Sequence, residues 1–135
     1  MNGNPTTPKS ILVADDEASI LRVVSLKLRN AGFEVITAQD GEEAWELACQ
    51  KTPDLLITDL QMPFLTGLEL CRRMREHPAT SAVPALMLTA RGVNLRPDEL
   101  LKTNIVLVMT KPFSPRGILE NVQRLLFGES ATIAP

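Results

Sequence analysis

Residues 54–63 of this chain read DLLITDLQMP, in which a short apolar run stops at Asp59. Residues 11–16 read ILVADD and repeat the arrangement, because a second apolar run stops at Asp15 and Asp16. Acidic side chains directly after an apolar run are expected where a buried strand of a parallel sheet reaches the edge at which the loops build a site. These two stretches therefore predict an α/β fold and direct attention to the residues that follow its other strands.

Strand-like runs occur five times along the chain. They are Ile11–Ala14, Phe33–Thr37, Leu55–Thr58, Ala85–Thr89 and Ile105–Met109. Three of them are almost continuously apolar, as is typical of central parallel strands that are covered on both faces. The run Phe33–Thr37 alternates more, which indicates a strand nearer an edge of the sheet.

Amphipathic stretches with helix-capping signals alternate with these runs. The predicted helices cover Ser19–Asn30, a segment capped by Asp40, a segment opened by the capping box of Thr66 and Glu69, the short segment Pro97–Lys102, and a segment opened by Ser114 and Pro115. Strands and helices in strict alternation predict a parallel sheet, and right-handed crossovers place helices on both of its faces.

Length and composition indicate one globular domain. The chain has 135 residues, of which 44% are hydrophobic and 22% charged. The formal net charge of −2 argues against a dedicated surface for nucleic acid or for an anionic membrane. We expect a domain over residues 10–128, a flexible N-terminal segment (1–9), and a flexible C-terminal tail or linker (129–135).

The chain carries the signs of a cytoplasmic protein. We find no targeting signal, and no apolar stretch approaches the roughly 20 residues that a membrane-spanning helix needs. The two cysteines, Cys49 and Cys71, are too few for a disulfide framework and lack the spacing of metal ligands, so we expect reduced thiols.

Polar side chains follow four of the five strands. Asp15 and Asp16 follow the first, Asp59 the third, Thr89 ends the fourth, and Lys111 follows the fifth. Each of these residues alone would be an ordinary cap, turn residue or solvated lysine, but independent caps have no reason to select this set. Carboxylates that converge on one edge repel one another unless positive charge lies among them. Lys111 supplies one such charge, and Mg²⁺ is the natural second because its preferred ligands are oxygen atoms.

These motifs resemble the receiver domain of bacterial two-component response regulators. The resemblance rests on ILVADD, on DLLITDLQMP, on LTA at residues 88–90 and on KPF at residues 111–113, and it extends from about Ser10 to Phe127. It implies a flavodoxin-like (βα)5 doubly wound sandwich with the strand order 2-1-3-4-5.

The resemblance also implies a role for each residue of the set. Asp59 matches the phosphoacceptor that takes a phosphoryl group from phosphohistidine on a sensor histidine kinase or a histidine phosphotransfer protein. The matches for Mg²⁺ binding are Asp16 directly, Asp15 through water, the backbone carbonyl of Gln61, and Asp59 itself. Lys111 matches the lysine that pairs with a phosphoryl oxygen, with a cis bond to Pro112, and Thr89 matches the hydroxyl that binds the new phosphate.

A domain of this kind is a switch rather than an enzyme, because it catalyses only its own phosphorylation and dephosphorylation. The resemblance implies that phosphorylation changes the face formed by the fourth helix, fifth strand and fifth helix. That face would signal to a downstream effector domain or protein, and members of the family also form homodimers through it.

Val108 departs from the family pattern, because a tyrosine or phenylalanine usually stands three residues before the lysine. Signalling through an aromatic rotamer therefore cannot operate here, and Val108 is the atypical switch position. Gln61 and Arg91, each two residues after a site residue, are predicted to flank the path of attacking water and to tune the rate of dephosphorylation. Val23 and Leu26 lie off the buried stripe of the first helix and fit the docking of a phosphodonor.

Three alternatives differ in their sequence requirements. A dehalogenase-like phosphatase would need a second aspartate two residues after Asp59, where Gln61 stands. A flavodoxin-like cofactor binder would need a phosphate loop after the first strand, where Asp15 and Asp16 would repel phosphate. A degenerate receiver that acts only as a protein-interaction module is disfavoured by the complete set of charged residues, whereas Val108 favours it.

Overall fold

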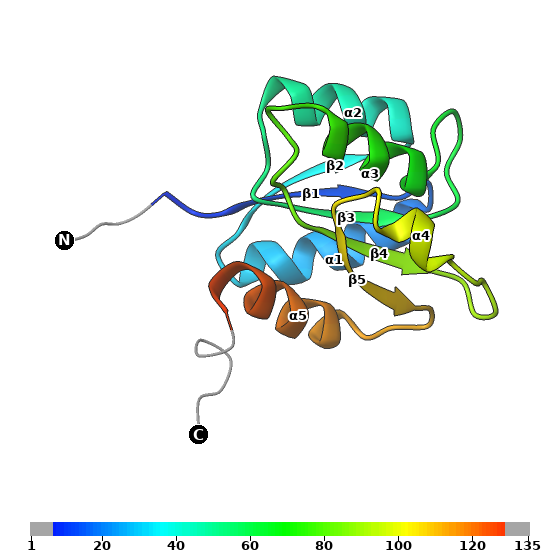
Figure 1. Ribbon diagram of the computed structural model, residues 1–135. Coiled ribbons are helices and arrows are strands. Elements are labelled where there is room, and N and C mark those ends of the chain that lie inside the picture. The colour runs from blue at the N-terminus through cyan, green and yellow to red at the C-terminus, as the bar shows by residue number, and fades with distance from the viewer. Residues whose placement is uncertain (1–6, 129–135) are drawn as a thin grey trace.

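The computed structural model describes residues 7–128, which form a parallel sheet of five strands between two layers of helices (Figure 1). The strands are β1 (Ser10–Ala14), β2 (Glu34–Ala38), β3 (Leu55–Asp59), β4 (Ala85–Thr89) and β5 (Ile105–Thr110). The helices are α1 (Ala18–Asn30), α2 (Gly41–Gln50), α3 (Gly67–Glu76), α4 (Pro97–Leu100) and α5 (Pro115–Phe127).

The strand order is β2-β1-β3-β4-β5, which confirms the predicted fold class and order. Every strand begins and ends within one residue of its predicted run. The predicted flexible ends fall almost entirely on residues 1–6 and 129–135, which lie outside the described residues. No helix within residues 7–128 is long and apolar enough to cross a membrane.

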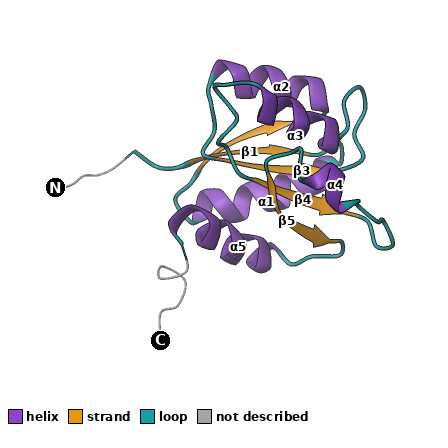
Figure 2. Ribbon diagram, viewed as in Figure 1, coloured by secondary structure: helices purple, strands orange, loops and turns teal. Residues whose placement is uncertain are grey.

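Figure 2 shows one layer of helices on each face of the sheet, and a hydrophobic core lies between the sheet and each layer. Leu55 and Ile57 of β3 point into the core that α1 and α5 cover, whereas Leu56 points into the core that α2 and α3 cover. Because successive residues of a strand point to opposite faces, a strand covered on both sides buries all its residues, as β3 does.

The two edge strands differ in how well their sequence patterns predicted an edge position. The alternation in β2 predicted an edge position, and β2 is an edge strand. The run Ile105–Met109 is apolar throughout, yet β5 is the opposite edge and its residues are only partly buried. The physical reason is that α4 has only four residues and covers little of the neighbouring face. Val106, which lies in a β-bulge of β5, is 55% exposed as a result.

Helix α3 begins in close contact with the end of β3. Thr66 Oγ1 accepts a hydrogen bond from Glu69 N at 3.1 Å, and Thr66 N donates to Glu69 Oε1 at 2.9 Å, which confirms the predicted capping box. These hydrogen bonds lower the pKa of the Glu69 carboxyl below its ordinary value. A Cβ on Gly67 would overlap the carbonyl oxygen of Asp59, so only glycine allows the helix to start there. The backbone at the end of β3 is therefore held in place by α3.

Phe64, in the loop between β3 and α3, adopts an unfavourable backbone conformation. Its φ is +69°, in the left-handed region that disfavours bulky residues, and its side chain is 78% exposed. Leu65 N donates to Pro63 O at 2.8 Å across the turn, and the flanking Met62 and Leu65 are buried. The buried residues on either side thus impose the positive φ on Phe64, and its exposed ring gains no burial energy that would offset the strain.

We predict that Phe64→Gly raises the free energy of unfolding by about 0.5–1 kcal/mol. Relief of about 1–2 kcal/mol of backbone strain exceeds the entropic cost of glycine, about 0.5–1 kcal/mol. Urea denaturation followed by circular dichroism measures the change, and Phe64→Ala is the control because alanine keeps the strained Cβ. A glycine variant less stable than the alanine variant would contradict this account.

Candidate functional site

Three carboxylates converge where β1 and β3 end. Asp15 and Asp16 follow the last residue of β1, and Asp59 is the last residue of β3. One carboxylate oxygen from each lies within 4.8 Å of the other two. Asp15 and Asp59 are buried whereas Asp16 is exposed, so the cluster is open to solvent on one side. The predicted convergence of these three side chains is confirmed.

Lys111, which follows β5, brings positive charge to this cluster. Its Nζ lies 3.2 Å from Asp59 Oδ1, 3.4 Å from Glu17 Oε1 and 3.7 Å from Asp15 Oδ2. The peptide bond from Lys111 to Pro112 is cis, as predicted. Lys111 N also donates to the carbonyl oxygen of Thr89 at 2.8 Å, which fixes the start of this loop against the end of β4.

Thr89, the last residue of β4, is buried at the same edge of the sheet. Its hydroxyl oxygen has no hydrogen-bond partner among residues 7–128. Asp15 Oδ2 likewise accepts no hydrogen bond within this part of the chain, although Asp15 Oδ1 accepts one from Glu17 N at 2.9 Å. Buried polar atoms are rarely left without partners, so these two atoms mark a place prepared for a polar ligand.

Burial and charge shift the pKa values of the cluster. Burial raises the pKa of Asp15 to about 6, against the lowering effect of the Glu17 N–H, and the negative charge of Asp59 adds to the rise. Burial also raises the pKa of Asp59, against the lowering effect of Lys111. Burial by itself would lower the pKa of Lys111, but its hydrogen bond to Asp59 and the surrounding carboxylates outweigh burial and raise it. The site thus combines two carboxylates whose burial opposes ionisation with a lysine that its carboxylate neighbours favour in the protonated form.

The other predicted site residues lie at the rim of this edge. Gln61 follows β3, Arg91 follows β4, and both side chains are exposed. Val108 pairs with Met87 in the β4–β5 ladder and is half-buried on β5. The tuning role of Gln61 and Arg91 and the switch role of Val108 stay predictions.

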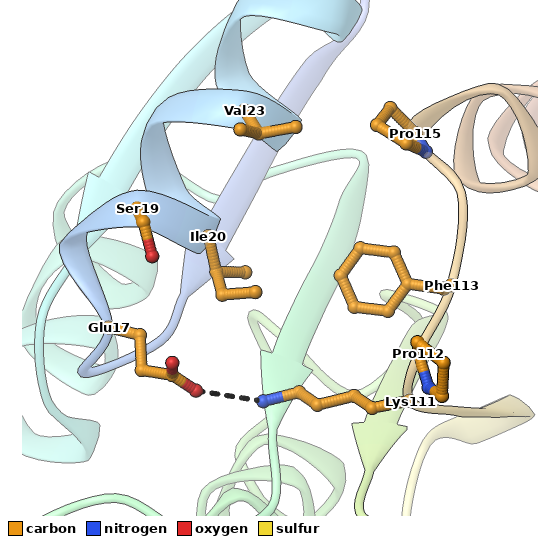
Figure 3. A pocket seen from close by; sticks show the side chains of 8 residues that line it. All are labelled: Glu17, Ser19, Ile20, Val23, Lys111, Pro112, Phe113 and Pro115. Carbon is orange, nitrogen blue, oxygen red and sulfur yellow. Dashed lines mark hydrogen bonds and ion pairs between the residues drawn. The ribbon is translucent and has the colours of Figure 1, made fainter.

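An apolar pocket of about 370 Å³ opens beside Lys111, between α1 and the segment that joins β5 to α5 (Figure 3). It is lined by Glu17, Ser19, Ile20, Val23, Lys111, Pro112, Phe113 and Pro115. In Figure 3 the ring of Phe113 points toward Ile20, and the ion pair of Glu17 and Lys111 lies at one end. Val23, predicted to belong to a docking surface, lines this pocket, whereas the exposed Leu26 does not.

Sequence reasoning missed two features of the site. Glu17 was not expected to pair with Lys111, which is 94 residues away in the chain. The sequence also did not indicate which of the two adjacent aspartates is buried, and the structure buries Asp15 and exposes Asp16. The only signal in the sequence is the position of Asp15 directly after a buried strand.

Comparison with known proteins identifies the class to which this fold and site belong. Residues 11–123 match the family described as the response regulator receiver domain. The chain belongs to this family. It is 41% identical over 118 residues to the alkaline phosphatase synthesis transcriptional regulatory protein PhoP of Bacillus subtilis, a match that covers 87% of this chain and 48% of PhoP. It is 34% identical to the phosphate regulon transcriptional regulatory protein PhoB of Pseudomonas aeruginosa, over 87% of this chain and 52% of PhoB.

Solved structures agree with this assignment. The chemotaxis response regulator CheY4 of Vibrio cholerae is 36% identical, with a TM-score of 0.82 over 89% of this chain and 100% of CheY4. The receiver domain of sensor histidine kinase PA1611 from Pseudomonas aeruginosa, solved with magnesium coordinated in its active-site cleft, is 25% identical. Its TM-score is 0.79, over 89% of this chain and 98% of that domain. The chain spans about half the length of the curated relatives that it matches.

We predict that Asp15→Asn stabilises the fold by about 1–2 kcal/mol at pH 7. A carboxyl whose pKa is higher in the folded chain than in the unfolded chain favours the fold at pH below 3.8, and this contribution is lost as the pH rises through about 6. A shift of this size corresponds to about 3 kcal/mol, which already includes the attraction to Lys111. The variant gains less than this because its buried amide needs hydrogen-bond partners of its own.

Urea denaturation in Mg²⁺-free buffer at pH 4, 5, 6 and 7 measures this effect. The fall in stability between pH 4 and pH 6 should be smaller in Asp15→Asn than in the parent chain. Asp16→Asn is the matched control, because Asp16 is exposed and its removal should change stability by less than about 0.5 kcal/mol. An unchanged pH profile in Asp15→Asn would show that the pKa of Asp15 is ordinary.

Proposed function

We propose that this receiver domain is a Mg²⁺-dependent phosphoryl-accepting switch, in which Asp59 takes a phosphoryl group from phosphohistidine on a sensor histidine kinase or a histidine phosphotransfer protein. The observation that carries the proposal is the position of Asp59. Its buried carboxylate lies 3.2 Å from Lys111 Nζ and within 4.8 Å of carboxylate oxygens of Asp15 and Asp16. A nucleophile, a fixed positive charge and an oxygen-rich set of ligands thus meet at one place.

The residues present fit a magnesium ion. Asp15, Asp16 and Asp59 offer carboxylate oxygens, and Asp15 Oδ2 accepts no hydrogen bond from residues 7–128. The ligand set assigned to Mg²⁺ is Asp16, Asp59, the backbone carbonyl of Gln61, and Asp15 through water. When bound, the ion neutralises phosphoryl oxygens and lessens the repulsion among the carboxylates.

In the transfer step a carboxylate oxygen of Asp59 forms a bond to phosphorus while the bond from phosphorus to the imidazole nitrogen breaks. The electron pair of that bond stays on the imidazole. The imidazole leaves neutral when its other nitrogen carries a proton, and otherwise it takes a proton from solvent. Lys111 stays protonated and pairs with a phosphoryl oxygen, and the Thr89 hydroxyl donates a hydrogen bond to another. The domain turns over no external substrate and catalyses only the formation and hydrolysis of its own aspartyl phosphate.

The phosphodonor docks, in this proposal, on the apolar pocket beside Lys111. The pocket adjoins the residue that pairs with Asp59, and Ile20, Val23 and Phe113 give it an apolar lining. A helix of the donor lying there would bring its phosphohistidine toward Asp59. A pocket with an apolar interior and an ion pair at its mouth suits such a helix.

The output of the switch is assigned to the face formed by α4, β5 and α5. Contact between Thr89 and the phosphoryl group draws the following loop inward, and the half-buried Val108 replaces the usual aromatic residue. The PhoP and PhoB relatives are transcriptional regulators about twice as long as this chain. This favours an effector domain or protein as the target that responds to the switch. We assign no nucleic-acid-binding surface to this chain. The proposal includes homodimerisation through the face formed by α4, β5 and α5.

The cytoplasm is the compartment we assign to this switch. Cys49 and Cys71 are free thiols, which agrees with a reducing environment. Burial raises the pKa of the Cys71 thiol well above its ordinary value, so this side chain is a neutral core residue.

We predict that the purified chain gains one phosphoryl group when it is incubated with Mg²⁺ and acetyl phosphate. Intact-protein mass spectrometry measures the gain, and removal of Mg²⁺ with EDTA should abolish it. Asp59→Asn should take up none, whereas Asp54→Asn is the matched control because Asp54 is exposed and lies at the opposite end of β3.

Two results would contradict the proposal in different ways. Absence of uptake by the parent chain would favour the degenerate receiver that acts only through binding. Uptake retained in Asp59→Asn would assign the acceptor to another residue.

A further prediction concerns the lifetime of the phosphorylated form. In the proposal, the exposed side chains of Gln61 and Arg91, which follow β3 and β4, flank the approach of water to Asp59. Replacing both by alanine should therefore speed the decay of the phosphorylated form by about threefold. Decay is followed by mass spectrometry after acetyl phosphate has been removed. An unchanged rate would exclude the tuning role.

A further inference from the structure

A second groove, of about 510 Å³, lies between α1 and the edge strand β2. It is lined by Ala18, Leu21, Arg22, Ser25, Leu26, Arg29, Thr37 and Gln39. We call it the arginine groove. It shares no residue with the apolar pocket beside Lys111, so the two cavities lie on different flanks of α1.

The arginine groove is lined by positive charge, and a carboxylate lies near its β2 side, because Glu43 Oε1 accepts a hydrogen bond from Gln39 N at 2.7 Å. No aspartate or glutamate lines it, although the chain as a whole has a net charge of −2. Neither Arg22 nor Arg29 forms an ion pair with a carboxylate within residues 7–128. Two guanidinium groups without carboxylate partners in one groove favour an anion.

Arg29 is held in place by the edge of the sheet. Its Nη2 donates to the carbonyl oxygen of Val35 at 3.1 Å. Glu34 N and Ala38 O bond toward β1, so the intervening Val35 presents its carbonyl to the outer edge of β2. The guanidinium is therefore ordered beside the groove before any ligand arrives, and its remaining N–H groups are available.

Ser25 gives an independent indication of a ligand. It lines the groove, is only 3% exposed, and its hydroxyl oxygen has no hydrogen-bond partner in the described part of the chain. Buried hydroxyl groups are normally satisfied, and because this oxygen is closed to solvent, an acceptor in the groove would reach it after the Ser25 side chain changes rotamer. Thr37 and Gln39 add a hydroxyl and an amide at the β2 side.

We propose that the arginine groove binds a small anionic ligand that carries linked phosphate groups. Its polar lining consists only of side chains that can donate hydrogen bonds, and phosphate oxygens accept more of them than a carboxylate does. Arg22 and Arg29 are seven residues apart on one helix, about 10 Å along its axis. A chain of linked phosphates reaches toward both arginines, whereas a single phosphate contacts one. This site is independent of phosphoryl transfer to Asp59.

The test is an NMR titration of the ¹⁵N-labelled chain with inorganic tripolyphosphate in Mg²⁺-free buffer at constant ionic strength. We expect saturable shifts in the amide signals of Ser25, Thr37 and Gln39, at lower concentrations than with sulfate. Arg22→Gln should weaken binding about tenfold, the loss expected for one charge-assisted contact.

Arg22 suits this test because its side chain is exposed and makes no hydrogen bond or ion pair within residues 7–128, so the variant keeps its fold. Arg72→Gln is the matched control, because it removes the same charge from an exposed residue of α3 outside the groove, and it should bind as the parent does. Asp59→Asn should also bind unchanged, which separates this site from the phosphoacceptor site.

Several results would overturn the proposal. They are the absence of saturable shifts up to about 10 mM tripolyphosphate, equal affinity in Arg22→Gln, and an equal response to sulfate. Tighter binding of an acidic octapeptide of aspartate and glutamate would also overturn it, and would reassign the groove to an acidic protein segment.

Discussion

Electrostatic repulsion among three carboxylates is the constraint around which this domain is organised. Parallel strands end on the same side of a sheet, so the residues that follow β1 and β3 cannot avoid one another. Lys111 reaches across from the end of β5 and offsets part of the repulsion. Burial raises the pKa values of Asp15 and Asp59, and the repulsion that Lys111 does not offset adds to the rise. The site therefore keeps uncompensated negative charge and buried oxygen ligands. Binding of a hard cation or a charged phosphoryl group changes the electrostatic energy of such a site strongly.

The fold could be predicted because its signals are local. The apolar run before Asp59 and the capping box of Thr66 and Glu69 each depend on a few neighbouring residues, and each has one favourable interpretation. The convergence of the site followed from topology, since strand ends meet at one edge. The contact of Glu17 with Lys111 could not be predicted, because it depends on side-chain directions in segments 94 residues apart. The same holds for the burial of Asp15 beside an exposed Asp16.

Two further features depend on packing that the sequence does not encode locally. The apolar composition of β5 suits a central strand, but its exposure is set by how little α4 covers it. Phe64 stands where the backbone favours glycine, and no neighbouring residue type signals that conformation. It follows from the burial of Met62 and Leu65 on either side.

The close approach of Gly67 to the carbonyl oxygen of Asp59 gives this domain a mechanical direction. Gly67 N donates to Leu60 O at 2.9 Å and Leu60 N donates to Leu88 O at 3.1 Å, so the main chain around Asp59 is braced on both sides. The Thr89 hydroxyl has no such brace within residues 7–128, and an exposed loop follows it. The main chain of Thr89 is held as well, because its carbonyl oxygen accepts a hydrogen bond from Lys111 N, so the freedom on the β4 side lies in the Thr89 hydroxyl and in the exposed loop. In the proposed switch, a phosphoryl group on Asp59 would therefore move the Thr89 side chain and this loop before it moved the main chain of β3.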